Sequence, residues 1–137
     1  MQSRLNAYLN FPGTAREAME FYQSIFGGRL SVSTFKEYGM VQNPADGDKI
    51  MHSMLEADNG ISFMGSDVPS NMPQPQTTTS LALSGDDKEE LTGYFNGLAA
   101  GGTIQQPLME SPWGDTFGMV TDKFGVDWMV NIAGQRS

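Results

Sequence analysis

Side chains able to carry acid–base or metal chemistry are sparse in this chain of 137 residues. His52 is the only histidine, and the absence of cysteine excludes thiol catalysis, thiolate metal sites and disulfides. His52 alternates with Met54 and Glu56, so a strand would present all three on one face. Along that strand His52 and Glu56 would lie about 13 Å apart, too far for one ion to bridge without a ligand from elsewhere. We therefore favour a histidine that is hydrogen-bonded in a sheet or lines a cavity over a metal ligand.

Other catalytic arrangements find little support in the sequence. His52 is the only candidate imidazole base, and neither a Gly-x-Ser-x-Gly elbow nor a phosphate-binding Gly-Lys-Ser/Thr loop is present. Glu37, Glu56 and Glu110 could act as acids or bases, although a solvated surface is their more ordinary role.

The balance of charge and apolar residues indicates a globular protein with an acidic surface. The formal net charge is −8, which argues against nucleic acid as a partner because phosphate contacts need a basic face. No apolar stretch approaches the roughly 20 residues of a membrane span, and the first residues do not resemble a signal peptide. We expect a cytoplasmic protein without a membrane partner.

Two segments of the sequence predict the same order of elements: a strand, a helix and three strands. Apolar residues alternate over 5–11, and a helix follows in which Thr14 and Glu17 have the spacing of a capping box. Apolar residues at helical spacing recur around Leu91 and Phe95. The remaining strands are expected at 30–35, 50–57, 61–64, 80–84, 103–109, 117–121 and 127–132, with a tight turn at 58–60.

The two segments are related by a faint duplication with an offset of 74 residues. The glycine pair Gly27-Gly28, which ends the first helix, falls on Gly101-Gly102, and Asn6 falls on Ser80. A repeat on this scale indicates one supersecondary unit used twice. Three further apolar pairs support the offset: Leu9 with Leu83, Phe21 with Phe95, and Leu30 with Ile104.

With these motifs the chain resembles the vicinal oxygen chelate superfamily of glyoxalase I, bleomycin-resistance proteins and extradiol dioxygenases, and within it the PhnB-like branch. The resemblance rests on residues 10–13, on Phe21-Tyr22 with residues 26–28, on Trp113-Gly114 and on residues 120–129. It implies an α+β fold of two βαβββ modules that form a curved mixed sheet around a cavity, with the helices outside. We expect one domain over 1–137, with modules at about 1–67 and 80–137 joined by a loop at 68–79, and a homodimer.

The resemblance also implies where a metal would be bound. Metal-dependent members of the superfamily place His and Glu ligands on the first and last strands of each module, where a divalent ion polarises substrate oxygens. The corresponding residues here are Asn6 and Ser80 on the first strands, and Met64 and Met129 on the last. None carries an imidazole or carboxylate, and thioethers prefer soft ions such as Cu(I). We expect neither a metal nor another cofactor.

The same strands predict the lining of a pocket for a small apolar or aromatic molecule. Sparse polar groups on an apolar surface are the usual composition of such a pocket, and methionine adapts to irregular shapes. Trp113, in a Ser-Pro-Trp-Gly turn, could cap the ligand, or could pack over a sheet edge. A filled core is the alternative to a pocket. The predicted lining comprises Asn6, Tyr8, Asn10, His52, Met64, Ser80, Trp113 and Met129.

Three functions follow from this arrangement. We favour a protein that binds a small apolar or aromatic molecule without a metal. The second is a lyase, isomerase or oxygenase of the same superfamily, with a displaced metal site at His52 and Glu56 or with no metal. In the third the cavity is filled and the dimer serves assembly alone.

Overall fold

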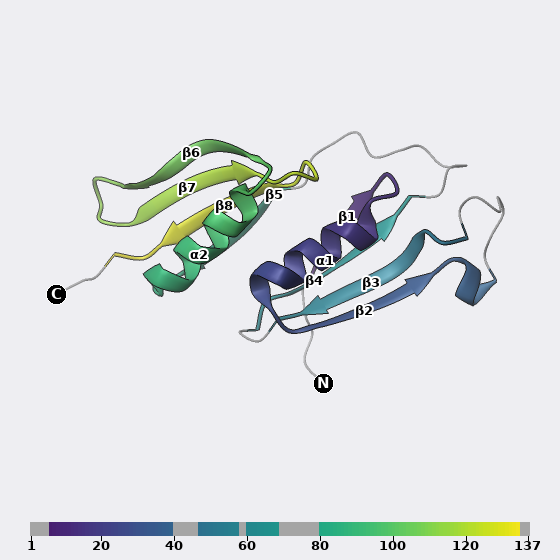
Figure 1. Ribbon diagram of the computed structural model, residues 1–137. Helices are drawn as coiled ribbons and strands as arrows, with labels where there is room; N and C mark the ends of the chain where they lie inside the picture. Colours follow the sequence, from purple (N-terminus) through teal and green to yellow (C-terminus); the bar gives the residue numbers. More distant parts are fainter. Residues whose placement is uncertain (1–5, 40–46, 58–59, 69–79, 135–137) are drawn as a thin grey trace. The chain divides into compact units, whose positions relative to one another are not determined.

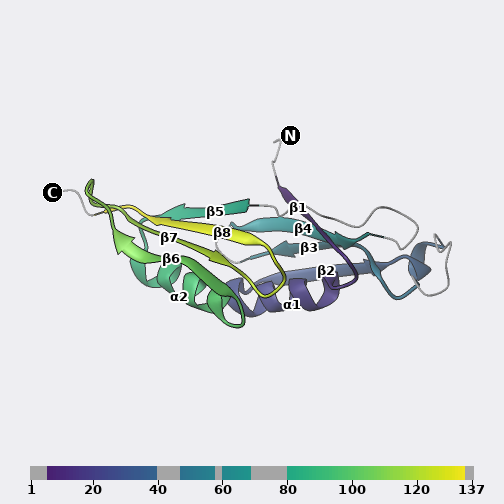
Figure 2. The same ribbon diagram turned by 90° about the horizontal axis from the view of Figure 1, so that it is seen from above.

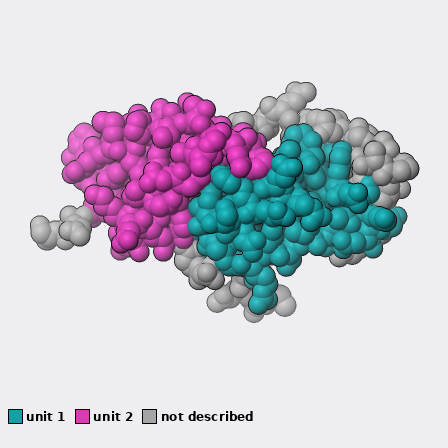
Figure 3. Space-filling model, in the orientation of Figure 1, with its two compact units in different colours: residues 1–77 teal, residues 78–137 magenta. Residues whose placement is uncertain are grey.

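The computed structural model describes residues 6–39, 47–57, 60–68 and 80–134. The chain divides into two compact units, residues 1–77 and residues 78–137 (Figure 3). In each unit a helix covers one face of a four-stranded mixed sheet (Figures 1 and 2). The α+β class and the two βαβββ modules predicted from the sequence are therefore confirmed.

The first unit has the strand order β1-β4-β3-β2, in which β1 is parallel to β4 and the other neighbours are antiparallel. The final strand continues to Asp67, three residues beyond the end predicted at Met64. Residues 58 and 59 of the predicted turn, and 69–79 of the predicted linker, lie outside the described residues. The elements are β1 (Ala7–Phe11), α1 (Ala15–Phe26), β2 (Arg29–Thr34), a short 3-10 helix η1 (Lys36–Tyr38), β3 (Ile50–Glu56) and β4 (Ser62–Asp67).

The second unit repeats this arrangement with the strand order β5-β8-β7-β6, and β5 is parallel to β8. Its elements are β5 (Ser80–Gly85), α2 (Lys88–Ala99), β6 (Thr103–Glu110), β7 (Thr116–Thr121) and β8 (Asp127–Ile132). In the part of the chain that the structure describes, neither helix has the length and apolar character needed to cross a membrane.

The core of each unit lies between its helix and one face of its sheet. In the first unit the alternation of β1 buries Leu9 and Phe11, and Phe63 of β4 packs edge-on against Tyr22 of α1 with ring centroids 5.5 Å apart. In the second, Trp128 is buried with only 1% of its surface exposed. Leu91 and Phe95, predicted at helical spacing, are buried in α2 together with Leu98. The buried residues of α1 are Ala15, Ala18, Met19, Tyr22 and Phe26.

The capping box predicted at Thr14 and Glu17 is wrong. Thr14 makes no side-chain capping hydrogen bond, and the buried carboxylate of Asp67 accepts one from the Ala15 amide at 2.8 Å. The second oxygen of Asp67 accepts from the Ile50 amide at 2.9 Å. A residue at the end of β4 thus satisfies the start of α1, which local sequence spacing does not reveal.

The duplicated glycine pairs mark places where two backbone segments approach closely. A Cβ atom on Gly28 would lie 2.0 Å from the carbonyl oxygen of Glu56, and one on Gly102 would lie 2.3 Å from that of Thr121. Both distances are far shorter than a van der Waals contact. The second glycine of each pair therefore lets the chain leaving the helix pack against the hairpin that follows.

Candidate functional site

The face of the first sheet that points away from α1 carries most of the predicted site residues. Leu9 and Phe63 point toward the helix and are buried, so their neighbours along each strand point to the opposite face. We call this surface the open face of the first unit. It carries Tyr8 and Asn10 of β1, Asn6 just before it, Ser62, Met64 and Ser66 of β4, and His52, Met54 and Glu56 of β3.

Hydrogen bonds hold the polar side chains of this face in place. The Ser62 hydroxyl donates to the side-chain oxygen of Asn6 at 2.7 Å, and the Tyr8 hydroxyl donates to that of Ser66 at 2.9 Å. Both link the first strand of the module to its last. Asn6 and Tyr8 are therefore oriented by their own sheet before any ligand arrives.

A histidine and two methionines lie together on the same face. The Nε2 atom of His52 lies 3.4 Å from the Sδ atom of Met64 on the neighbouring strand. Met54 is the direct cross-strand partner of Met64 in the antiparallel pair of β3 and β4. Sequence analysis placed His52 and Met54 on one face but did not pair either with Met64, because periodicity along one strand does not give the register of the next.

The second unit has an equivalent open face. Ser80, Ala82 and Ser84 of β5 lie on it, and Met129 of β8 is the register partner of Ala82. Met119 of β7 is the antiparallel partner of Met129, as Met54 is of Met64. A cross-strand methionine pair thus occupies corresponding places in the two modules.

The residue two positions before the first methionine of each pair differs between the units. It is His52 in the first unit and Phe117 in the second. The duplication has therefore produced one face with an imidazole beside two thioethers and another with a phenyl ring in its place.

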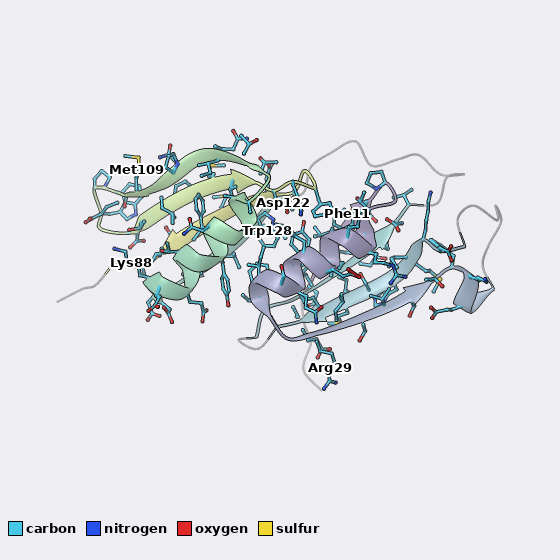
Figure 4. The ribbon with its side chains drawn as sticks, viewed as in Figure 1. Phe11, Arg29, Lys88, Met109, Asp122 and Trp128 are labelled. Atoms are coloured by element: carbon cyan, nitrogen blue, oxygen red, sulfur yellow. The ribbon has the colours of Figure 1, made fainter. Side chains whose placement is uncertain are left out.

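Trp113 lines an apolar groove at the edge of the second sheet. The groove has a volume of about 350 Å³ and lies between the end of β6, the following turn and the start of β7. Trp113 is 72% exposed and Met109, labelled in Figure 4, is 58% exposed. We call it the Trp113 groove; its lining residues are Gln106, Met109, Glu110, Ser111, Trp113 and Phe117.

The turn that carries Trp113 is held by several hydrogen bonds. The Ser111 amide and hydroxyl both donate to the carbonyl oxygen of Asp115, at 2.6 and 2.8 Å, and the Gly114 amide donates to the carbonyl of Ser111 at 3.0 Å. The Asp115 carboxylate accepts from the Gly134 amide at 2.9 Å. The indole is thus exposed on an ordered turn, as a binding surface for a flat ligand requires.

The predicted site residues therefore fall into three groups. Five lie on the open face of the first unit, Ser80 and Met129 lie on that of the second, and Trp113 lies in its groove. Sequence analysis missed Met109 and Phe117, although both stand in predicted strands that flank the predicted turn. The five residues of the first group are Asn6, Tyr8, Asn10, His52 and Met64.

Comparison with known proteins identifies the family. The sequence model of the Glyoxalase/Bleomycin resistance protein/Dioxygenase superfamily matches residues 4–130. The chain belongs to this superfamily. The resemblance to the vicinal oxygen chelate proteins is therefore confirmed, and the duplicated module is the one that the superfamily uses.

Relatives within the superfamily cover nearly the whole chain. Protein YjdN of Escherichia coli K12 is 32% identical and the match spans 96% of this chain and 97% of YjdN. The crystal structure of PA1353 from Pseudomonas aeruginosa has 38% identity and a TM-score of 0.80, covering 98% of this chain and 100% of the other. A PhnB protein from Bacillus cereus, provisionally described as a 3-demethylubiquinone-9 3-methyltransferase, has 31% identity and a TM-score of 0.69, covering 96% and 100%.

The residues predicted at the superfamily's metal positions offer no imidazole or carboxylate to a divalent ion. These positions hold Asn6, Ser80, Met64 and Met129, which offer an amide, a hydroxyl and two thioethers. Within the described ranges, no group of three or more His, Cys, Asp or Glu residues could hold a metal ion. No step through a divalent metal follows from these residues.

Proposed function

We propose that this protein binds a small apolar or aromatic molecule in the Trp113 groove, without a divalent metal. The observation that carries the proposal is the grouping of Trp113, Met109 and Phe117 around a hollow of about 350 Å³. This size lies at the lower end of the range of roughly 300–1,000 Å³ that is usual for ligand pockets. Aromatic side chains stack on flat ligands, and a thioether makes favourable contacts with a ring edge.

The exposure of these side chains supplies a driving force for binding. An exposed indole and thioether leave apolar surface in water, and a ligand that covers about 150 Å² of it would gain roughly 4 kcal/mol. The entropic cost of association reduces this gain. A ligand of two or three fused rings could cover both Trp113 and Met109, whereas a smaller one could not.

Charge favours neutral or cationic ligands over anionic ones. Glu110 lines the groove, and the whole chain carries a formal net charge of −8. A cation over the face of an indole gains a further electrostatic attraction. The proposed ligand class is therefore a neutral or cationic fused-ring aromatic molecule.

Titration with three fluorescent dyes of different charge tests this proposal. We expect cationic proflavine and neutral Nile red to bind saturably, and anionic 8-anilinonaphthalene-1-sulfonate to bind at least tenfold more weakly. Trp113→Ala should weaken the first two dyes at least tenfold, while Trp113→Phe retains most of the affinity. Dye binding that is unchanged in Trp113→Ala would overturn the proposal. Emission from the buried Trp128 reports whether the variant remains folded, since the sequence has only two tryptophans.

Homodimer assembly belongs to the same proposal. Its support is membership of the superfamily together with exposed apolar side chains that do not line the groove, Tyr8 in the first unit and Ile104 in the second. Sedimentation equilibrium should give twice the chain mass of 14.9 kDa. A monomer at every concentration tested would contradict it. The single domain over 1–137 and the cytoplasmic location stay predictions from the sequence.

The sequence and the sheets of this chain give no support to the activity in the name of the Bacillus cereus protein. The sequence has no Gly-x-Gly-x-x-Gly loop between a strand and a helix, which methyl-donor nucleotides and dinucleotides commonly require. Its two sheets are mixed and four-stranded, unlike the open parallel sheet of nucleotide-binding folds.

A further inference from the structure

We propose that His52, Met54 and Met64 form a binding site for a soft monovalent metal ion, Cu(I) or Ag(I), on the open face of the first unit. The proposal is independent of the Trp113 groove, which lies in the other unit. It also differs from the divalent site of metal-dependent relatives, because two of its donors come from β3 and all three lie in one sheet.

The distance between two of the donors is within about 0.4 Å of what a shared ion requires. Nε2 of His52 and Sδ of Met64 lie 3.4 Å apart. An ion bonded to both at about 2.0–2.1 Å and 2.3 Å, the lengths known for zinc with imidazole and thiolate ligands, would hold them about 3.8 Å apart at the trigonal angle of a three-coordinate site. Binding would therefore need little movement of either side chain. In the free protein the same contact is an imidazole–thioether hydrogen bond when Nε2 of His52 carries the proton.

The pairing of β3 with β4 places a third donor, the sulfur of Met54, beside the other two. Met54 stands directly across from Met64, and such partners have Cβ atoms about 4.5–5.5 Å apart. Met54 also lies two residues after His52 on the same strand and face. A methionine side chain has three rotatable bonds, so its sulfur can turn toward the ion held by the other two. Imidazole and two thioethers complete a three-coordinate set.

The chemistry of the donors selects the ion. Thioethers are soft ligands that favour Cu(I), and imidazole also suits copper, whereas Mg²⁺, Ca²⁺ and Mn²⁺ prefer oxygen donors. The sequence has no cysteine to compete for a soft ion, and His52 is its only imidazole. The acidic net charge further favours a cation over an anion at this face.

The second unit provides an internal control. Met119 and Met129 form the equivalent pair, but Phe117 replaces the histidine. If paired thioethers alone were sufficient, both units would bind a soft ion equally. If the imidazole is needed, only the first unit will bind.

Silver titration of the full chain tests the site. Silver nitrate is added in chloride-free buffer, and the methionine methyl signals are followed by NMR. We expect one equivalent to shift the methyl signals of Met54 and Met64 while those of Met119 and Met129 stay in place. His52→Phe should weaken silver binding at least tenfold, and so should Met64→Leu, which keeps the side-chain volume nearly constant.

Two results of the silver titration would overturn the proposed site. Equal shifts at both methionine pairs, or unchanged affinity in His52→Phe, would mean that silver binds thioethers adventitiously and would overturn the proposal. Met129→Leu is the matched control and should leave the affinity unchanged. The methyl shifts of the natural protein localise the ion without any variant, so a variant that fails to fold does not decide the outcome.

Discussion

His52 and Phe117 occupy equivalent positions in the two units of this protein. Each stands two residues before a methionine whose direct cross-strand partner is another methionine, Met54 with Met64 in one sheet and Met119 with Met129 in the other. The two units thus share the same strand pairing and the same methionine pair, and they differ in the residue beside it, which is histidine in one and phenylalanine in the other. An imidazole in contact with a thioether suits a soft ion, whereas a phenyl ring beside the exposed Trp113 suits a flat apolar ligand.

Exchange of this residue should transfer the metal response. Phe117→His places an imidazole beside Met119 and Met129, so we expect the variant to bind a second equivalent of Ag(I) with an affinity within about tenfold of the first. Isothermal calorimetry gives the stoichiometry. Phe117→Leu is the control and should keep one equivalent. A Phe117→His variant that folds and still binds one equivalent would contradict the equivalence of the two sites.

The glycine that follows α2 should not tolerate a side chain. Gly102→Ala would bring its Cβ within 2.3 Å of the Thr121 carbonyl oxygen, so we expect a loss of unfolding free energy of about 2–3 kcal/mol. Gly93→Ala is the matched control in the same unit. A Cβ on Gly93 meets nothing within 4 Å, so alanine there should stabilise the helix by about 0.5–1 kcal/mol. Chemical denaturation measures both, and equal effects would refute the close approach.

The carboxylate of Asp122 holds the turn between β7 and β8. One oxygen accepts from the Phe124 amide at 2.8 Å and from the Val126 amide at 3.1 Å, and the other accepts from the Trp128 indole at 2.8 Å. Asp122 is 3% exposed, and Figure 4 shows it beside Trp128. Asp122→Ala leaves these buried donors without their acceptor and should cost about 3–4 kcal/mol.

Asp86→Asn is the control for Asp122. Its side chain is exposed, so the unfolding free energy should change by no more than about 0.5 kcal/mol. Thermal unfolding followed by near-ultraviolet circular dichroism reports the environment of Trp128 directly. Similar melting temperatures for the two variants would rule out the proposed role of Asp122.

The two helices should respond differently to loss of the residue before them. Asp87 caps α2 by accepting a hydrogen bond from the Glu90 amide at 3.0 Å, so Asp87→Ala should cost about 1 kcal/mol. Thr14 makes no such bond, so Thr14→Ala should cost less than about 0.5 kcal/mol. Urea denaturation of the two variants measures the difference. A larger loss of unfolding free energy in Thr14→Ala than in Asp87→Ala would indicate that Thr14 does cap α1.

The sequence was sufficient to predict the features of the fold that depend on the periodicity of apolar residues. Alternation in the strands and helical spacing around Tyr22 and Phe95 predicted both modules, and the glycine pairs marked both helix ends. The sequence was insufficient to predict contacts that depend on how one strand is aligned with the next or with a helix. Asp67 lies 52 residues from the amide that it caps, and the contact of His52 with Met64 joins two neighbouring strands. No local pattern encodes such pairings.

The candidate site divides in the same way. Alternation from Asn6 placed Tyr8 and Asn10 on one face because it needs only the period of a strand, whereas Met64 was predicted from the resemblance. The Trp113 groove could not be predicted in this way, because it forms where Met109, Trp113 and Phe117 come together across a turn. The predicted turn contained Trp113 but gave no sign of which strand residues would lie beside it.

The most direct test of the central claim observes the two tryptophan indole N–H groups by NMR during titration with proflavine. Trp113 is 72% exposed in its groove and Trp128 is 1% exposed in the core, so the two signals report the site and the fold separately. We predict that the Trp113 signal shifts saturably with one equivalent while the Trp128 signal stays in place. A Trp113 signal that does not move while proflavine binds would contradict the account.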